Sequence, residues 1–199
     1  MTVIEVTQQR DELTQRQRWS HYLVLAFALA AVLLGINMRD AALNATVLYA
    51  DSAAGIRSFH PRGWLVDSDG DYVFRVRDMA RIGFKTTITV RVVPVTVSTS
   101  ARNILDSLIL NRQQTLAAFS VLAREPFEIR EGLTADSMTY TFVSRDEDPF
   151  LQGLPTVVEG IDVLIVQGGQ AIVVSFLTDA SEFTTLLPVF ERFLNDLSF

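Results

Sequence analysis

The stretch VLIVQGGQAIVVSF, residues 163–176, decides the fold of this chain. Its two apolar runs, Val163 to Val166 and Ala171 to Phe176, are almost continuous, whereas a strand with one solvent-facing side would alternate apolar and polar residues. The Gln-Gly-Gly-Gln sequence between them contains glycines that tolerate the positive φ of a tight hairpin. The pattern therefore predicts two adjacent central strands that are covered on both faces.

Four segments on the N-terminal side of this hairpin alternate apolar and polar residues, which is typical of strands with one buried face. Their apolar positions are Tyr72, Phe74 and Val76; Ile88, Val90 and Val92; Phe127 and Ile129; and Met138, Tyr140 and Phe142. Gly132 lies between the last two segments, so these two are predicted to form an antiparallel pair. Together with the central hairpin, the four segments indicate an antiparallel sheet.

Two helices are predicted to cover the sheet. Ser100 can cap a helix whose apolar residues lie largely on one side, namely Leu105, Leu108, Ile109, Leu116 and Phe119. The C-terminal segment carries a wide apolar stripe at three-and-four spacing, formed by Phe183, Leu186, Leu187, Phe190, Phe193, Leu194 and Leu197. Because proline is tolerated in a first turn and not in a helix interior, Pro188 predicts that this helix is capped by Thr184 or Thr185.

A charge-free apolar segment, Trp19 to Met38, precedes the sheet. Its twenty residues would span about 30 Å as a helix, which matches the hydrocarbon core of a bilayer. Three arginines precede the segment, whereas Arg39, followed at once by Asp40, comes after it, so the positive-inside bias predicts a cytoplasmic N-terminus. A cleaved secretory signal is the alternative, but the apolar run exceeds a usual signal core and no clean A-x-A site follows it.

We therefore expect a single-pass protein of the cell membrane with a periplasmic or otherwise extracytoplasmic α+β domain. The predicted parts are a cytoplasmic segment (1–18), a transmembrane helix (19–38), a linker or membrane-proximal helix (39–55) and the domain (56–199). Within the span, Ala31 and Gly35 form a small-x-x-x-small pair that can let a neighbouring transmembrane helix approach closely. Chance composition in an alanine-rich span explains the pair equally well.

Composition excludes several chemistries. The absence of cysteine excludes disulfides, thiolate nucleophiles and iron–sulfur clusters, and two histidines cannot form a multi-histidine metal site within one copy. The net charge of −6 lies in the soluble part, because residues 1–50 carry four basic and four acidic groups while residues 51–199 carry thirteen and nineteen. An acidic domain without a basic stripe is a poor nucleic-acid binder, and no P-loop or G-x-G-x-x-G motif occurs. No cofactor and no nucleic-acid partner are predicted.

One acidic cluster has spacing that suggests a metal site. Asp67, Asp69 and Asp71 alternate, and Asp78 stands where the twelfth residue of a calcium loop would fall. The sixth loop position is Tyr72 instead of the required glycine, and Asp78 is shorter than the usual bidentate glutamate. A solvated hairpin turn is the favoured interpretation.

A second acidic cluster, formed by Asp146, Glu147 and Asp148, is predicted to lie in an exposed loop that can contact a partner. Catalysis has little support in the sequence. His60 is the sole histidine outside the membrane segment, and no G-x-S-x-G elbow presents a nucleophile, so His60 is predicted to be structural. An enzyme would have to rely on carboxylates such as Asp67, Asp69, Asp71 and Glu159.

The order of motifs in residues 51–199 resembles the PsbP-like family. The resemblance rests on Phe59-x-Pro61-x-Gly63-Trp64, a hairpin, a central helix, Gly153-Leu154-Pro155 before a long hairpin, and a Phe-rich terminal helix ending Leu197-Ser198-Phe199. It implies an α/β/α sandwich around a central antiparallel sheet and a non-catalytic role at the outer face of membrane complexes, notably photosystem II. This chain departs from the plant members because its own transmembrane anchor replaces a targeting peptide, and no motif fixes a photosystem partner.

The leading hypothesis is therefore a membrane-anchored accessory subunit or assembly factor of a larger complex, in an energy-transducing electron-transfer system that is photosynthetic or respiratory. Its expected partners are integral membrane subunits and the lipid bilayer. The alternative is a membrane-tethered ligand-binding or sensory domain, which would need an aromatic-lined pocket with a few convergent polar groups.

Overall fold

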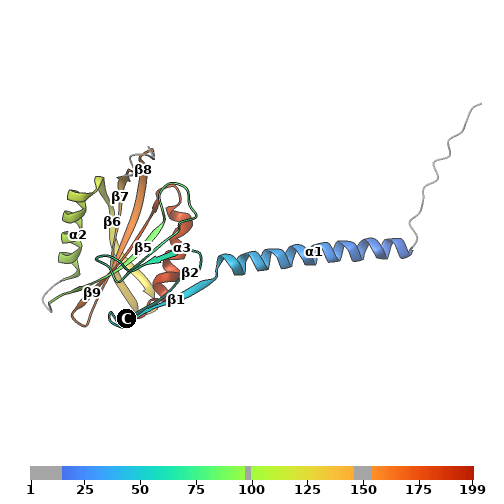
Figure 1. Ribbon diagram of the computed structural model, residues 1–199, viewed down its shortest axis with the longest axis horizontal. Helices are drawn as coiled ribbons and strands as arrows, with labels where there is room; N and C mark the ends of the chain where they lie inside the picture. The colour runs from blue at the N-terminus through green and yellow to red at the C-terminus, as the bar shows by residue number, and fades with distance from the viewer. Residues whose placement is uncertain (1–14, 97–99, 146–153) are drawn as a thin grey trace, which may run out of the picture. The chain divides into compact units, whose positions relative to one another are not determined.

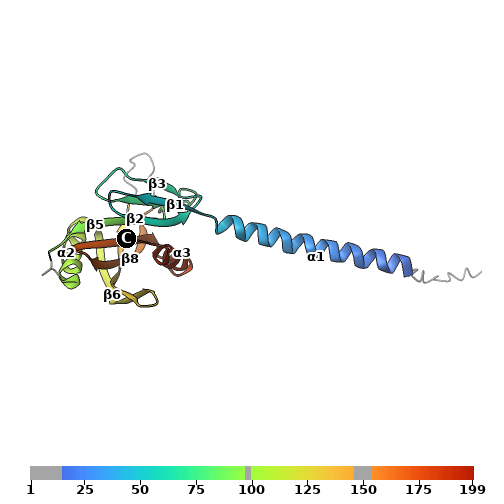
Figure 2. The same ribbon diagram turned by 90° about the horizontal axis from the view of Figure 1, so that it is seen from below.

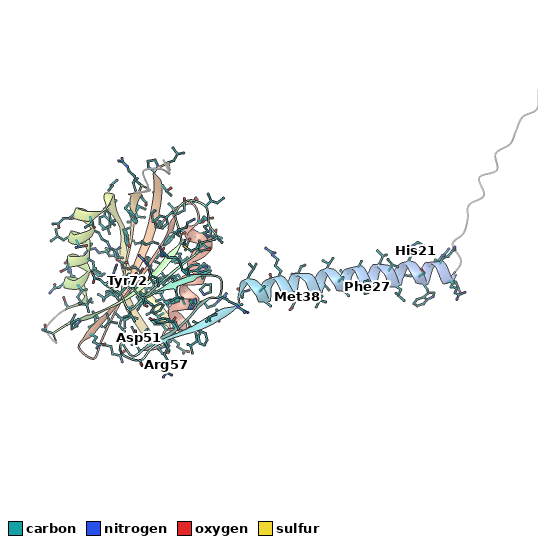
Figure 3. The ribbon with its side chains drawn as sticks, in the orientation of Figure 1. His21, Phe27, Met38, Asp51, Arg57 and Tyr72 are labelled. Atoms are coloured by element: carbon teal, nitrogen blue, oxygen red, sulfur yellow. The ribbon has the colours of Figure 1, made fainter. Side chains whose placement is uncertain are left out.

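The computed structural model describes residues 15–96, 100–145 and 154–199, which divide after Ala45 into two compact units. The described part of the first unit is dominated by one helix, α1 (Gln15–Leu43), drawn in blue in Figure 1. This helix is long and apolar enough to cross a membrane, and a signal sequence near an N-terminus has the same properties. Its side chains, among them Phe27 and Met38, project into open space (Figure 3), and no residue of α1 is buried.

The segment predicted as a linker, residues 39–55, is largely structured. The helix α1 continues to Leu43, which agrees with the predicted alternative of a membrane-proximal helix. The strand β1 (Thr46–Asp51) then pairs antiparallel with β2 (Ile56–Pro61). The second compact unit thus begins at residue 46, ten residues before the predicted boundary at residue 56. The strand β1 escaped prediction because it is mostly exposed; its main core contact is Tyr49, whose ring centroid lies 4.3 Å from that of Phe74.

Within the described residues, seven strands form the main sheet in the order β3-β4-β5-β9-β8-β7-β6, and all neighbours are antiparallel. Figures 1 and 2 show this sheet between the two short helices. The strands are β3 (Leu65–Asp67), β4 (Phe74–Arg77), β5 (Thr87–Pro94), β6 (Ala117–Arg130), β7 (Leu133–Ser144), β8 (Thr156–Gln167) and β9 (Gln170–Asp179). The four alternating segments of the sequence correspond to β4, β5, β6 and β7, and Gly132 forms the predicted turn between the last two.

The predicted central hairpin is β8 and β9, which lie in the interior of the sheet. Gly168 (φ 60°) and Gly169 (φ 79°) form the turn, and both backbones occupy the left-handed region that favours glycine. Side chains on both faces of the hairpin are buried, for example Val163 on one face and Leu164 on the other. The prediction that these strands are covered on both sides is confirmed.

The two covers are α2 (Ala101–Thr115) and α3 (Phe183–Asn195), which pack on opposite faces of the sheet (Figures 1 and 2). Ser100 caps α2 as predicted, accepting a hydrogen bond from the backbone N–H of Asn103 at 3.3 Å. The helix ends earlier than its apolar pattern suggested, and Phe119 contacts the same core from β6, with its ring centroid 5.4 Å from that of Tyr140. The domain is an α/β/α sandwich.

The start of α3 differs from the prediction. The helix begins at Phe183 with Glu182 as its N-cap, so neither Thr184 nor Thr185 is the cap and Pro188 lies inside the helix. The reason is burial: the Phe183 ring packs 5.8 Å from that of Phe176 in the core, and helical backbone already at this residue holds it there. The gain from burying an aromatic ring, about 1.5–3 kcal/mol, offsets part of the cost of proline in a helix interior, about 3 kcal/mol.

A close approach between β7 and β8 requires a glycine. Gly160 is the cross-strand partner of Tyr140, and a Cβ atom at position 160 would lie 2.8 Å from Cζ of Tyr140 and 2.6 Å from Cδ2 of Leu177. The Tyr140 ring is fully buried above the glycine. The space that a side chain would fill is therefore taken by the tyrosine.

We predict that Gly160→Ala lowers the free energy of unfolding by about 1–3 kcal/mol, because the new methyl group must displace the buried Tyr140 ring or Leu177. Urea unfolding of the full chain in detergent, followed by the circular dichroism of the sheet, measures this change. The control is Gly63→Ala, since a Cβ at Gly63 meets no atom within 4 Å. A Gly160→Ala protein as stable as the control variant would contradict the prediction.

Candidate functional site

A row of polar side chains crosses one face of the sheet from its β3 edge to β8. Residues directly opposite each other on adjacent antiparallel strands share a face. The chain of cross-strand partners is Asp67 (β3), Arg75 (β4), Thr89 (β5), Ser175 (β9) and Asp162 (β8), which we call the polar row. Because Asp162 contacts Arg112 of α2, the polar row lies on the α2 side of the sheet.

At the β8 end, a buried ion pair joins α2 to the sheet. Arg112 donates from Nη2 to Oδ1 of Asp162 at 2.8 Å, and its guanidinium carbon lies 4.2 Å from the centroid of the Tyr140 ring. Asp162 is fully buried and the Arg112 side chain is 11% exposed. Burial raises the pKa of the Asp162 carboxyl, and the neighbouring Arg112 opposes that rise. The pair is sealed beneath α2, which fits a role in holding the helix.

At the β3 end, Asp67 is surrounded by donors. Its Oδ2 accepts from Nη2 of Arg75 at 2.6 Å and from the hydroxyl of Tyr72 at 2.9 Å, and its Oδ1 accepts from the backbone N–H of Asp69 at 2.9 Å. Arg77 lies further away, with Nη2 3.7 Å from Oδ2. The backbone N–H of Asp69, followed by Arg75 and Tyr72, lowers the pKa of Asp67 from 3.8 to about 2. Asp67 is thus an ionised carboxylate whose partners belong to this chain.

The candidate calcium residues do not come together. Asp67 is held by Arg75, while Asp78 forms an ion pair with Arg81 at 2.9 Å. Asp69 and Asp71 are exposed in the loop between β3 and β4. In residues 15–96, 100–145 and 154–199, no group of three or more potential metal ligands is assembled. The alternating spacing suggested a loop of ligands, but the cross-strand position of Arg75 makes Asp67 part of an ion pair.

The other candidate residues are scattered. Asp146, Glu147 and Asp148 lie outside the described residues, and Ala31 and Gly35 lie exposed on α1.

The carboxylates named for an enzyme do not form a pair. Glu159 is half-buried on β8, where burial raises the pKa of its carboxyl. It is an odd number of residues from Asp162 on the same strand, so the two carboxylates face opposite sides. His60 is buried on β2, with its ring Nδ1 3.0 Å from the carbonyl oxygen of Pro61, which fits a structural role.

Two hollows on the surface are open to solvent. The first, about 440 Å³, lies at the end of the sheet beside Arg81, Ile82 and Phe84. The second, about 320 Å³, lies between α2 and β6 beside Arg102 and Arg124. Aromatic side chains do not line these hollows apart from Phe84, so neither has the aromatic lining that the ligand-binding alternative requires.

Sequence reasoning missed the arginines of this face. Arg75, Arg77 and Arg91 occupy polar positions of β4 and β5, and Arg112 reaches toward them from α2. Since these residues are separated in the sequence, the domain was expected to lack a basic stripe. The available signal was the alternation itself, which places Arg75 and Arg77 on the same face of a strand.

Similarity to known proteins is found by comparing structures. No family model matches the chain, and no curated protein matches its sequence. The cyanobacterial PsbP protein CyanoP of Synechocystis sp. PCC 6803 superposes with a TM-score of 0.57 at 12% identity, covering 77% of this chain and 91% of CyanoP. The second unit, residues 46–199, has a PsbP-like fold.

Two further proteins share the PsbP-like sandwich. LpqN of Mycobacterium tuberculosis superposes with a TM-score of 0.51 at 14% identity, covering 77% of this chain and 88% of LpqN. The Saccharomyces cerevisiae protein Mog1p superposes with a TM-score of 0.50 at 10% identity, covering 77% of this chain and 95% of Mog1p. LpqN is described as involved in cell envelope biogenesis and Mog1p as a Ran-binding protein, and none of the three PsbP-like proteins is named as an enzyme. At these identities the likeness shows the fold.

We predict that Asp67 stabilises the protein in a pH-dependent way. Its pKa is lowered on folding, so its contribution is fully present above its unfolded value near 3.8 and is lost as the pH falls toward about 2. The difference in free energy of unfolding between the wild type and Asp67→Asn should therefore be constant from neutral pH to about pH 4 and shrink below it. Urea unfolding across this pH range measures the difference.

The control for Asp67→Asn is Asp71→Asn, which removes an exposed carboxylate from the loop that follows β3. If Asp67→Asn matches the wild type at neutral pH, or if both variants give the same pH profile, the ion pair with Arg75 does not stabilise the fold.

Proposed function

We propose that this protein is a non-catalytic, membrane-anchored accessory subunit or assembly factor of a larger membrane complex. The helix α1 crosses the cell membrane with its N-terminus in the cytoplasm, and the PsbP-like domain lies on the extracytoplasmic side. The observation that carries the proposal is α1 itself: its residues 19–38 carry no charge, and no residue of the helix is buried within the chain. Such a helix is stable when lipid or other transmembrane helices cover it.

The chemistry of the domain supports an accessory role. Its most deeply buried ion pair, Arg112 with Asp162, joins α2 to the sheet and is sealed from solvent. The two hollows are open and shallow, and the described residues assemble no metal cluster. A domain with these properties acts through its surface, which suits a subunit that binds other proteins.

The neighbourhood we propose is an energy-transducing electron-transfer complex, photosynthetic or respiratory. The likeness to CyanoP supports this choice, and the likeness to LpqN, which is involved in cell envelope biogenesis, supports an extracytoplasmic domain. Within the membrane, we expect a partner helix to approach α1 at Ala31 and Gly35, which lie one turn apart on the same side.

Purification of the full chain from membranes in a mild detergent tests this function. We predict that the protein elutes with integral membrane subunits and that Gly35→Leu reduces the amount of these subunits, because the larger side chain separates the helix backbones. The matched control is Ala26→Leu, which adds bulk on the opposite side of α1. A monomer without membrane partners, or a protein recovered without detergent, would refute the proposal.

A further inference from the structure

The hairpin of β1 and β2 has one face inside the domain and one face outside it. Figures 1 and 2 show the two strands side by side. On β2, every second side chain is buried, namely Ile56, Ser58 and His60. Ser58 donates from Oγ to the backbone carbonyl of Phe193 in α3 at 3.3 Å. The inner face therefore attaches the hairpin to the α3 side of the domain.

The outer face of the hairpin combines apolar and basic side chains. Leu48 and Phe59 are direct cross-strand partners and are 52% and 42% exposed. Because directly opposite residues have Cβ atoms about 4.5–5.5 Å apart, these two side chains form one apolar patch. Arg57 lies on the same face two residues from Phe59, is exposed, and is the partner of Ala50. We call Leu48, Ala50, Arg57 and Phe59 the outer hairpin face.

The charge of the hairpin is opposite to that of the chain as a whole, which is −6. Residues 46–63 contain two arginines, Arg57 and Arg62, and one acidic residue, Asp51. Asp51 is the partner of the buried Ile56, so it lies on the inner face, and its Oδ1 accepts from two backbone N–H groups of the turn. Neither arginine forms an ion pair within the part of the chain that the structure describes. Both positive charges are therefore available to a ligand.

The chain between α1 and β1 is short. Asn44 and Ala45 alone separate the last residue of the helix from the first residue of the strand. From Met38, where the charge-free segment ends, one further turn of helix and three extended steps reach Thr46, a distance of at most about 18 Å. With the charge-free segment in the hydrocarbon core, β1 is thus the first part of the domain that the chain brings to the lipid surface.

The size and composition of the outer hairpin face favour lipid as its occupant. A stable protein–protein interface buries about 800 Å² on each partner, and two half-exposed apolar side chains fall well short of this area. A bilayer interface takes up aromatic and aliphatic side chains, and its anionic lipids attract arginine. Since α1 already tethers the domain, the second attachment is intramolecular and a small contact is sufficient.

We infer that the outer hairpin face rests on the anionic lipid surface of the bilayer that holds α1. Leu48 and Phe59 enter the headgroup layer, and Arg57 contacts lipid phosphate. The inference rests on the proposed function for its membrane anchor and adds a second, reversible attachment. Because α2 covers the face of the sheet opposite α3, the contact leaves the α2 side open to a protein partner.

The test uses a fluorescent label on the full chain, which contains no cysteine, so a single introduced cysteine is labelled without background. The variant Ala50→Cys carries a nitrobenzoxadiazole label on the outer hairpin face and keeps Leu48, Phe59 and Arg57. The protein is reconstituted in nanodiscs of phosphatidylcholine and phosphatidylglycerol that contain a lipid with a nitroxide on its headgroup. We expect the nitroxide to quench the label at position 50 and not at Gln113→Cys, an exposed position on α2.

Replacement of the apolar patch separates docking from mere tethering. Leu48→Ser with Phe59→Ser should shift the equilibrium about tenfold toward the undocked state, because two apolar side chains no longer enter the interface. The matched control is Leu110→Ser with Leu122→Ser, which removes two exposed leucines from α2 and β6 and should leave quenching at position 50 unchanged. Nanodiscs of phosphatidylcholine alone should also weaken quenching, since Arg57 then has no anionic lipid to contact.

Three results would overturn the inference. One is equal quenching at positions 50 and 113. Another is quenching at position 50 that the Leu48 and Phe59 replacements leave unchanged although circular dichroism shows that the variant is folded, because the tether alone would then explain it. The third is conversion of a dimer to a monomer by these replacements with unchanged quenching, which would assign the face to a second copy of the chain.

The nanodisc assay contains no partner subunit. Lipid contact by a protein that purifies without membrane subunits would refute the proposed function and leave the inference standing. A membrane complex in which the label at position 50 is not quenched would do the reverse.

Discussion

The fold depends on the two-sided burial of the β8–β9 hairpin. Because Val163 and Val174 face one side and Leu164 and Val173 the other, the centre of the sheet is stable only when both sides are covered. Each large apolar side chain removed from water contributes about 1.5–3 kcal/mol, so an uncovered face would lose much of the stability of a domain this size. The α/β/α arrangement follows from this requirement.

The two covers meet the requirement in different ways, and the difference bears on function. The α3 side is packed with apolar groups, and the Phe190 and Phe176 rings stack with centroids 5.1 Å apart. The α2 side contains the polar row, so α2 is held partly by the buried pair of Arg112 and Asp162. Beyond α2, the Arg75 and Arg77 side chains of β4 are 32% and 31% exposed, so this part of the face is charged and reachable. A charged face of this kind can bind a protein surface of opposite charge.

The sequence predicted the parts of the fold whose signals are local. The glycine turn, the apolar runs of β8 and β9 and the cap at Ser100 each lie within a few residues, and each was placed correctly. The strand β1 was missed because it buries little, and the position of Pro188 was misjudged because the burial of Phe183 against Phe176 is a tertiary contact.

The candidate site was harder to predict because it depends on register. Arg75, Thr89, Ser175 and Asp162 are neighbours only because β5 pairs with β9, and periodicity alone does not specify that pairing. The same limitation explains why Asp67, Asp69, Asp71 and Asp78 were considered as a calcium loop. Its spacing is visible in the sequence, whereas the arginine opposite Asp67 becomes apparent only when β3 and β4 are paired.

The central claim is that α1 holds the domain at the bilayer, with the outer hairpin face against lipid. Site-specific photo-cross-linking in intact membranes tests it most directly, with p-benzoylphenylalanine at Leu48, which is exposed on β1 opposite Phe59 and leaves every arginine in place. The same group at Leu110, exposed on α2, is the control. The account predicts phospholipid adducts from position 48 and few from position 110. Equal adducts from both positions, or none from position 48, would contradict it.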